Sequence, residues 1–151
     1  MLVVSGLVSL DDMKGVLVFI IGGKHFCLPF NILFAVVNPR DIKPASFTVN
    51  TKENFIKYNG EIIPLINFHN AFGMNSISVT DKTHLIILEK EGRKLAFYSD
   101  SVEELISFDR YIKDSVKILQ PVTDDPALCE ILLEGKHFTM PDFDALRRYV
   151  R

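Results

Sequence analysis

The sequence predicts an all-β protein, built as a sandwich or as small barrels. Short apolar runs recur along its 151 residues, and glycine-containing turn signals separate them. These signals are Gly22-Gly23, Asn59-Gly60, Glu91-Gly92 and Glu134-Gly135. No long helical segment intervenes, which disfavours a parallel α/β sheet. Closing many short strands into small barrels is an economical way to remove unpaired sheet edges.

The first hairpin is expected near the start of the chain. Val16–Ile21 is continuously apolar, rich in β-branched residues and bounded by glycines, which is typical of a buried strand. Lys24–Leu28 is expected to return antiparallel to it across Gly22-Gly23. Phe30–Val37 is ambiguous, since it could hold a helical turn, but its two terminal valines favour a strand at its end.

The second hairpin follows a polar stretch, Thr48–Glu53. It has the clearest turn, because Asn-Gly best tolerates the two positive φ angles of a type I′ turn. Pro64 lies inside its second strand and has no N–H for a ladder. We therefore expect this strand at a sheet edge, or with Pro64 facing outward. A short turn of helix is expected to follow and to end at Gly73. The unpaired edge of the strand that contains Pro64 is a place where a partner could dock.

The second half continues the pattern of hairpins. Thr83–Leu88 and Arg93–Ser99 are expected to pair across Glu91-Gly92. Apolar and polar residues alternate only in part over Val102–Phe108. Because the neighbouring segments are expected to be strands, we prefer a strand over a helix here. Asp109–Val122 is mixed and could hold a helical turn.

The chain ends on a last hairpin and a helix. Cys129–Leu133 and His137–Met140 flank the Glu134-Gly135 turn. Asp142 can cap the helix. Its apolar residues fall on one face at helical spacing: Phe143, Leu146 and Val150.

Composition indicates a packed globular domain. Hydrophobic residues make up 48%, with 12 Phe and no Trp, which is enough for a sizeable core. The net charge of −2, without blocks of like charge, predicts no nucleic-acid partner. The apolar N-terminus lacks a basic region before Lys14 and is too short to span a bilayer. We expect it to add a strand or to fray, and we expect a cytoplasmic protein without membrane insertion.

The sequence carries no catalytic signature: it has no G-x-S-x-G, glycine-rich phosphate loop or H-E-x-x-H. The best metal candidate joins His25 and Cys27, which share a strand face, with Cys129 and His137. The Cys129-to-His137 step matches no standard zinc spacing, and both cysteines lie in apolar runs typical of core thiols. We favour a binding module without catalysis or cofactor. A metal-binding protein or enzyme using these four residues is the alternative.

Four stretches of the chain resemble a CheW-like chemotaxis coupling domain, in the order in which that family has them. They are GVLVFIIGGKHFCLPFNILFAVV, NFIKYNGEIIPLINF, THLIILEKEGRKLAFYSDSVEEL and HFTMPDFDALRR. The resemblance runs from about Val16 to Arg148. No single motif is decisive, but the ordered set is specific.

The resemblance implies two small five-stranded, SH3-like β-barrel subdomains and a short C-terminal helix. We expect an N-terminal segment over 1–14 and a CheW-like domain over 15–151. The expected parts of the domain are a subdomain near 24–80, a second near 15–23 plus 83–141, and a helix over 142–151.

The resemblance also implies a function, that of a non-catalytic adaptor. Such a protein couples the regulatory domain of a CheA-type histidine kinase to the cytoplasmic helices of chemoreceptors. In this family the kinase contact is an apolar interface between barrels. The receptor helix lies in the groove between the subdomains.

The sequence departs from the family pattern at several recognition positions. In the hairpin block, Asn54 replaces a family glycine, and Lys57 and Asn59 replace the Asn and Arg of N-L-R-G. Ala35 replaces the Glu of V-x-E-[IV], with Leu33 at the position of the Val. Asn67 replaces the Asp after P-V-[IV], and Ala96 replaces a later glycine. Loss of an arginine that can bind bidentately is not neutral. An alternative is therefore a scaffold for a different histidine-kinase pathway that has lost receptor binding.

We predict two groups of partner-binding residues. The kinase-facing edge comprises Leu33, Ala35, Phe55, Lys57, Tyr58 and Asn59. The receptor groove comprises His84, Ala96 and Asp100. Leu33 and Phe55 could instead be core residues, and Asp100 could cap the kink that follows it.

Overall fold

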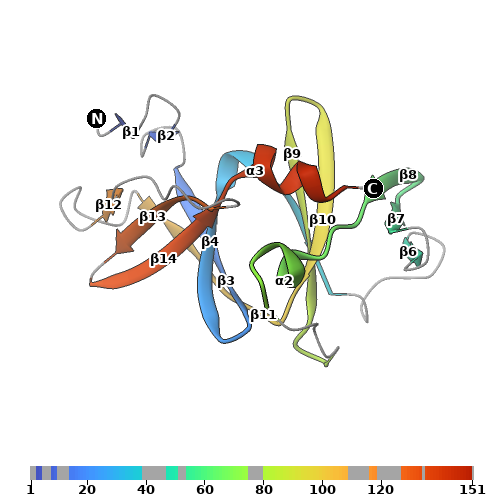
Figure 1. Ribbon diagram of the computed structural model, residues 1–151, viewed down its shortest axis with the longest axis horizontal. Coiled ribbons are helices and arrows are strands. Elements are labelled where there is room, and N and C mark those ends of the chain that lie inside the picture. The colour runs from blue at the N-terminus through green and yellow to red at the C-terminus, as the bar shows by residue number, and fades with distance from the viewer. Residues whose placement is uncertain are drawn as a thin grey trace.

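Figure 1 shows a computed structural model of the chain. The structure describes residues 3–4, 8–9, 14–38, 47–50, 54–74, 80–108, 116–118, 127–133 and 135–150. Within these ranges the fold is mostly β-strand and closes on a short C-terminal helix. The predicted all-β class is confirmed.

The largest sheet has six strands in the order β11-β3-β4-β14-β13-β12. Its pairs are antiparallel, except that β4 and β14 run parallel and meet at Phe26 and Thr139. Its strands are β3 (Gly15–Ile21), β4 (Lys24–Pro29), β11 (Ser101–Ser107), β12 (Val116–Ile118), β13 (Ala127–Leu133) and β14 (Lys136–Pro141). The predicted first and last hairpins and the preferred strand after Asp100 are confirmed.

Two three-stranded sheets lie between β4 and β11 in the sequence, in the orders β10-β9-β5 and β6-β7-β8. Their strands are β5 (Leu33–Val37), β6 (Phe47–Asn50), β7 (Phe55–Tyr58), β8 (Glu61–Pro64), β9 (His84–Lys90) and β10 (Arg93–Ser99). Leu65 joins the two sheets through a parallel bridge to Ala96, and Ile66 N–H donates to the Ala96 carbonyl at 2.8 Å. Pro64 ends β8 at the edge of its sheet, as predicted.

The remaining elements are short. They are β1 (Val3–Val4), β2 (Val8–Ser9), the 3-10 turns η1 (Phe30–Ile32) and η4 (Arg147–Tyr149), and the helices α2 (Phe68–Ala71) and α3 (Phe143–Leu146). β1 and β2 pair only with each other among the described strands. Asn67 and Asp142 cap α2 and α3 through their side chains, because carboxamide and carboxylate oxygens accept the orphan N–H groups of a first turn.

Two stretches differ from the expectations. The polar stretch Thr48–Glu53 overlaps strand β6, which pairs with β7. Within Asp109–Val122, where a helical turn was considered, residues Val116–Ile118 form strand β12; the rest lies outside the described residues. In both cases pairing with a neighbouring strand determines the structure, which local sequence patterns do not contain.

Three apolar clusters hold the sheets together. The central cluster brings together the rings of Phe19, Phe26, Phe68 and Phe97, whose neighbouring centroids lie 4.6–5.8 Å apart. It joins β3 and β4 of the large sheet to β10 and α2. Burying each such ring contributes about 1.5–3 kcal/mol, so this cluster fixes the two halves against one another. A second cluster lies within the six-stranded sheet, and a third lies between β9, β10 and the β7–β8 hairpin.

The strand pairing suggests where the two subdomains divide. The boundaries given by the sequence remain a prediction. We propose a modified division in which strands β5 to β10 form one subdomain. Strands β3, β4 and β11 to β14 form the other, because β5 pairs with β9 and β3 pairs with both β4 and β11.

Candidate partner-binding surfaces

The β7–β8 hairpin presents its turn to solvent. Asn59 and Gly60 have φ angles of 49° and 84°, the left-handed pair that a type I′ turn requires. Lys57 and Asn59 are exposed, whereas Phe55 and Tyr58 are half-buried. The inward positions, Ile56 and Ile63, are fully buried in the third cluster and anchor the hairpin.

Two further predicted kinase-facing residues, Leu33 and Ala35, lie on strand β5 and pack against different apolar clusters. Ala35 packs against the third cluster, together with Tyr58. Leu33 packs against the central aromatic cluster instead. The structure thus brings Ala35 and Tyr58 onto one small core, and places Leu33 against another.

Sequence reasoning missed the exposed apolar side chains of this region. Phe34 and Ile62 are 45% and 65% exposed, and Val36 is exposed as well. We call Phe34, Val36 and Ile62 the exposed apolar strip. Because the run from Ile32 to Val37 is apolar throughout, it has no polar residue to show which alternate positions face outward.

A charged cluster holds Phe34 in place. The Lys94 ammonium lies 4.6 Å from the Phe34 ring centroid, a cation–π contact. The same nitrogen lies 2.9 Å from Glu61 and 3.0 Å from Glu89. Hydrogen bonds to Glu61 and then Glu89 raise the pKa of Lys94 above its ordinary value. Lys94 therefore stays charged and links β5, β9 and the hairpin turn.

The predicted groove residues lie on and beside the β9–β10 hairpin, with different exposures. His84 begins β9, is half-buried, and its Nδ1 lies 2.7 Å from the Lys82 carbonyl. Ala96 has 0% exposure and pairs with Leu65 through the parallel bridge, so its side chain is not accessible from the surface.

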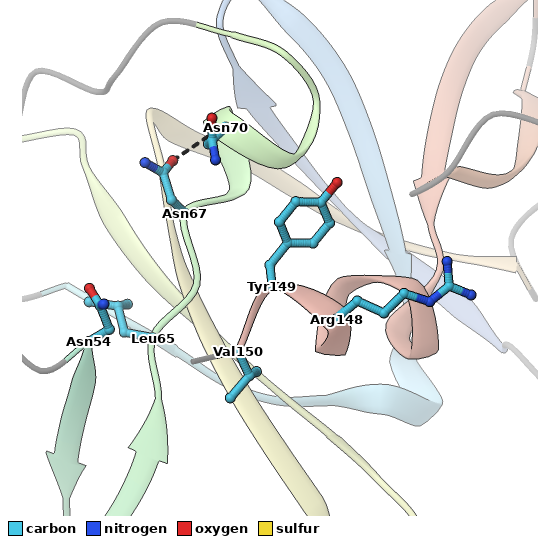
Figure 2. Close-up of a pocket in the computed structure, with 7 residues that line it drawn as sticks. All are labelled: Asn54, Leu65, Asn67, Asn70, Arg148, Tyr149 and Val150. Carbon is cyan, nitrogen blue, oxygen red and sulfur yellow. Dashed lines mark hydrogen bonds between the residues drawn. The ribbon is translucent and has the colours of Figure 1, made fainter.

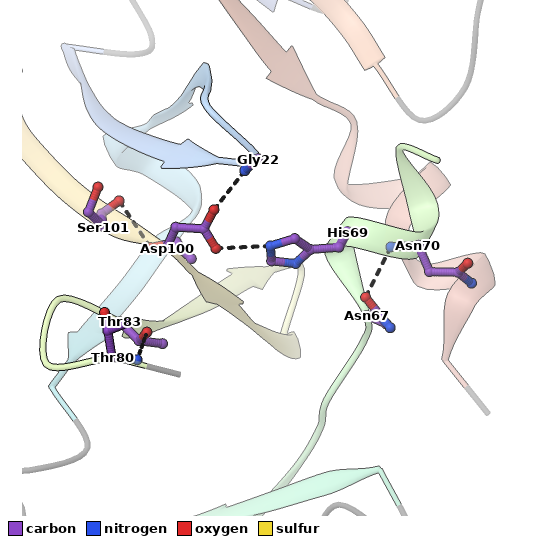
Figure 3. A network of polar contacts seen from close by, with 9 residues as sticks. Gly22, Asn67, His69, Asn70, Thr80, Thr83, Asp100 and Ser101 are labelled. Atoms are coloured by element: carbon purple, nitrogen blue, oxygen red, sulfur yellow. Dashed lines mark hydrogen bonds and ion pairs between the residues drawn. The ribbon is translucent and has the colours of Figure 1, made fainter. Parts of the chain in front are cut away.

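Asp100 takes part in an internal polar network, which Figure 3 shows. Its Oδ2 accepts a hydrogen bond from Gly22 N–H at 2.7 Å, and its Oδ1 lies 3.0 Å from Nε2 of His69. His69 is almost completely buried at the start of the chain's α2 helix. This histidine was not singled out from the sequence, because its partner lies far away in the chain.

A pocket of about 320 Å³ lies between the start of α2 and residues 148–150 near the C-terminus. Figure 2 shows Tyr149 standing between the carboxamides of Asn67 and Asn70 on one side and the Arg148 side chain on the other. Among the described residues, the lining comprises Asn54, Leu65, Asn67, Asn70, Arg148, Tyr149 and Val150.

The four residues of the metal alternative do not form a suitable ligand set. His25 and His137 are exposed beside Glu103 and Glu130, at 3.4 and 3.8 Å. Cys27 and Cys129 are fully buried in the second cluster. Burial raises the pKa of both thiols, that of Cys129 to about 11, which disfavours the thiolate that metals bind. No group of three or more potential ligands occurs among the described residues.

No helix in the described ranges is long and apolar enough to cross a membrane.

Comparison with known proteins identifies the class. The family model of the CheW-like domain matches residues 15–127, so the chain belongs to the CheW-like domain family. Members of this family are non-catalytic scaffolding domains of chemotaxis signalling. A comparison with curated proteins finds no match.

A solved structure agrees with this assignment. The scaffolding protein TtCheW from Thermoanaerobacter tengcongensis has a similar fold, with a TM-score of 0.65 at 22% identity, over 86% of this chain and 89% of that one. The predicted fold of two SH3-like subdomains is confirmed by this likeness.

Proposed function

We propose that this chain is a cytoplasmic adaptor that couples a CheA-type histidine kinase to the cytoplasmic helices of chemoreceptors. Its membership of the CheW-like family supports the proposal. The observation that carries it is the exposed apolar strip beside the hairpin turn. Exposed apolar side chains on a well-packed domain commonly mark a protein–protein contact.

On the kinase side, we propose that the regulatory domain docks on the exposed apolar strip and on Lys57, Tyr58 and Asn59. The cation–π contact with Lys94 already orders the Phe34 ring, so docking costs less side-chain entropy. Lys94 contacts this ring and is itself paired with Glu61 and Glu89, so charged groups adjoin the apolar residue as they do at the rim of an interface.

On the receptor side, we propose that a receptor helix docks beside the start of β9 and the end of β10. His84 is the residue we expect to contact it. Ala96 and Asp100 would act indirectly, because Ala96 is fully buried and both carboxylate oxygens of Asp100 have internal partners.

The replaced charges suggest how this adaptor differs from the family pattern. Asn59 stands where the family has an arginine, so the kinase contact relies on apolar burial. We expect its affinity to change little with ionic strength, since apolar contacts are not screened by salt.

Two nearly equally exposed apolar residues allow a matched test. Ile62 is 65% exposed on the proposed kinase face, and Leu105 is 64% exposed on β11 of the other sheet. Isothermal titration with a CheA regulatory domain should show Ile62→Glu weakening binding about tenfold or more, as for a buried interface anchor. Leu105→Glu should bind within about twofold of the original chain. Normal binding by Ile62→Glu, or loss of binding by Leu105→Glu alone, would overturn the assigned face.

A further inference from the structure

The turn that leads into β9 is held by its own hydrogen bonds. Oγ1 of Thr83 accepts a hydrogen bond from Thr80 N–H at 2.9 Å, and Oγ1 of Thr80 accepts one from Lys82 N–H at 3.2 Å. Thr83 N–H donates to the Thr80 carbonyl at 3.2 Å, and Thr83 is only 2% exposed. Figure 3 shows the contact between the two threonines. These bonds fix the backbone of the turn, including the Lys82 carbonyl, at the start of the strand.

The Lys82 carbonyl determines which nitrogen of the His84 ring carries a proton. Nδ1 of His84 lies 2.7 Å from the Lys82 oxygen, which is a hydrogen-bond distance. A carbonyl oxygen only accepts hydrogen bonds, so Nδ1 is the donor. In the neutral imidazole the other nitrogen, Nε2, then has no proton and presents a lone pair. The backbone of the turn therefore selects the tautomer of His84.

Nε2 of His84 is the acceptor that this part of the fold leaves for a partner. Among the residues that the structure describes, Nε2 has no hydrogen-bond partner, and the side chain is half-buried. The neighbouring polar side chains are used internally. Ser99, which pairs with His84 across the two strands, donates its hydroxyl to the Ser101 carbonyl at 3.2 Å. Both carboxylate oxygens of Asp100 have internal partners as well.

We propose that His84 accepts a hydrogen bond through Nε2 from a side chain of the receptor helix. The inference rests on the proposed function for the docking of a chemoreceptor cytoplasmic helix beside the start of β9. It assigns what that helix presents, which is a side-chain N–H or O–H group. An ionised carboxylate has no proton to donate to the lone pair. The exposed Asp81 and Lys82 carry opposite charges, so the turn adds no net formal charge that would favour an ion pair.

The tautomer is measured first, in the whole chain without a partner. Long-range ¹H–¹⁵N correlation spectra at about pH 8, where an unperturbed imidazole is neutral, distinguish a protonated from an unprotonated ring nitrogen. We expect His84 to have a protonated Nδ1 and an unprotonated Nε2. Addition of a receptor cytoplasmic fragment should shift the Nε2 resonance more than the Nδ1 resonance. The opposite tautomer in the free chain would overturn the inference.

Two substitutions separate the roles of the two ring nitrogens. In His84→Asn the carboxamide can still donate to the Lys82 carbonyl, but no atom occupies the position of Nε2. In His84→Gln the longer side chain can place its carbonyl oxygen there as an acceptor. Titration with a receptor cytoplasmic fragment should show His84→Asn binding about tenfold more weakly than the original chain. His84→Gln should bind within about threefold of it.

The matched control is His137→Asn. It makes the same change at an exposed histidine on β14 of the large sheet, away from the proposed receptor contact, and should bind the fragment within about twofold of the original chain. Loss of binding by this control equal to that of His84→Asn would overturn the assignment to His84.

The results separate this inference from the adaptor function. Equal binding by His84→Asn and the original chain, or weaker binding by His84→Gln than by His84→Asn, would overturn the assigned donor while receptor binding itself persists. If the fragment does not bind the original chain at all, the receptor side of the proposed function is overturned, and the donor on the receptor helix is overturned with it.

Discussion

Oδ1 of Asp100 lies 3.0 Å from Nε2 of His69, a side chain with only 4% exposure. The second carboxylate oxygen accepts a hydrogen bond from Gly22 N–H. This arrangement connects the β3–β4 turn, helix α2 and the bend between β10 and β11 (Figure 3). Asp100 therefore has an internal role, through which we expect it to hold these three elements together.

The first prediction concerns the stability that this network provides. Asp100→Ala should lower the free energy of unfolding by about 2 kcal/mol, because it leaves the buried His69 and the Gly22 N–H without their acceptor. Urea unfolding followed by circular dichroism measures this change. Asp144→Ala is the control, since Asp144 forms an exposed ion pair with Lys90 at 3.0 Å that contributes about 0–1 kcal/mol. Equal effects of the two substitutions would contradict the structural role of Asp100.

The second prediction concerns the buried cysteines. Neither Cys27 nor Cys129 should react with a thiol reagent in the folded protein at pH 8, and both should react after unfolding in urea. Counting the thiols labelled with and without urea checks this. Rapid labelling of the folded chain would contradict the burial of the two thiols.

The third prediction concerns pH and follows from the same burial. Folding raises the pKa of both thiols, so the unfolded state loses their protons first as the pH rises. The stability that the neutral thiols contribute is fully present below about pH 9.0 and decreases as the pH rises toward 11. Unfolding curves across this range should show that the Cys129→Ala variant loses less stability than the original chain.

The fourth prediction concerns the hairpin turn. Asn59→Arg restores the family residue at a φ of 49°, where a residue other than Gly, Asn or Asp is strained. We expect the variant to be about 1 kcal/mol less stable, measured by thermal unfolding. It should also bind a CheA regulatory domain more tightly if the partner presents an acidic group at this position. Asn59→Gly is the control for stability, because it fits the turn without strain, and it should leave the free energy of unfolding nearly unchanged.

Local turn chemistry made much of this fold predictable. The Asn59-Gly60 turn has the two positive φ angles that its sequence indicates, and the Glu91-Gly92 turn has them as well, although glutamate does not favour this conformation. The partial alternation after Asp100 is explained by a register shift between Val102 and Glu104, which still leaves β11 a strand. The order of the six-stranded sheet could not be predicted, since the contact of Phe26 with Thr139 joins distant parts of the chain.

The candidate site was harder to predict for two physical reasons. The apolar run around β5 does not show which alternate side chains face outward, so the sequence prediction names Leu33 and Ala35, whereas the exposed residues are Phe34 and Val36. The buried partner of Asp100 is brought to it only by the tertiary fold. Both features depend on packing between sheets, which no local pattern contains.

The most direct test of the adaptor function is whether one chain holds both partners at once. Analytical ultracentrifugation of the chain mixed with a CheA regulatory domain and a receptor cytoplasmic fragment measures this. We predict one sedimenting species that contains all three proteins, because the proposed surfaces lie on different parts of the fold. Binding of neither partner, or competition between them for one surface, would contradict the proposed function.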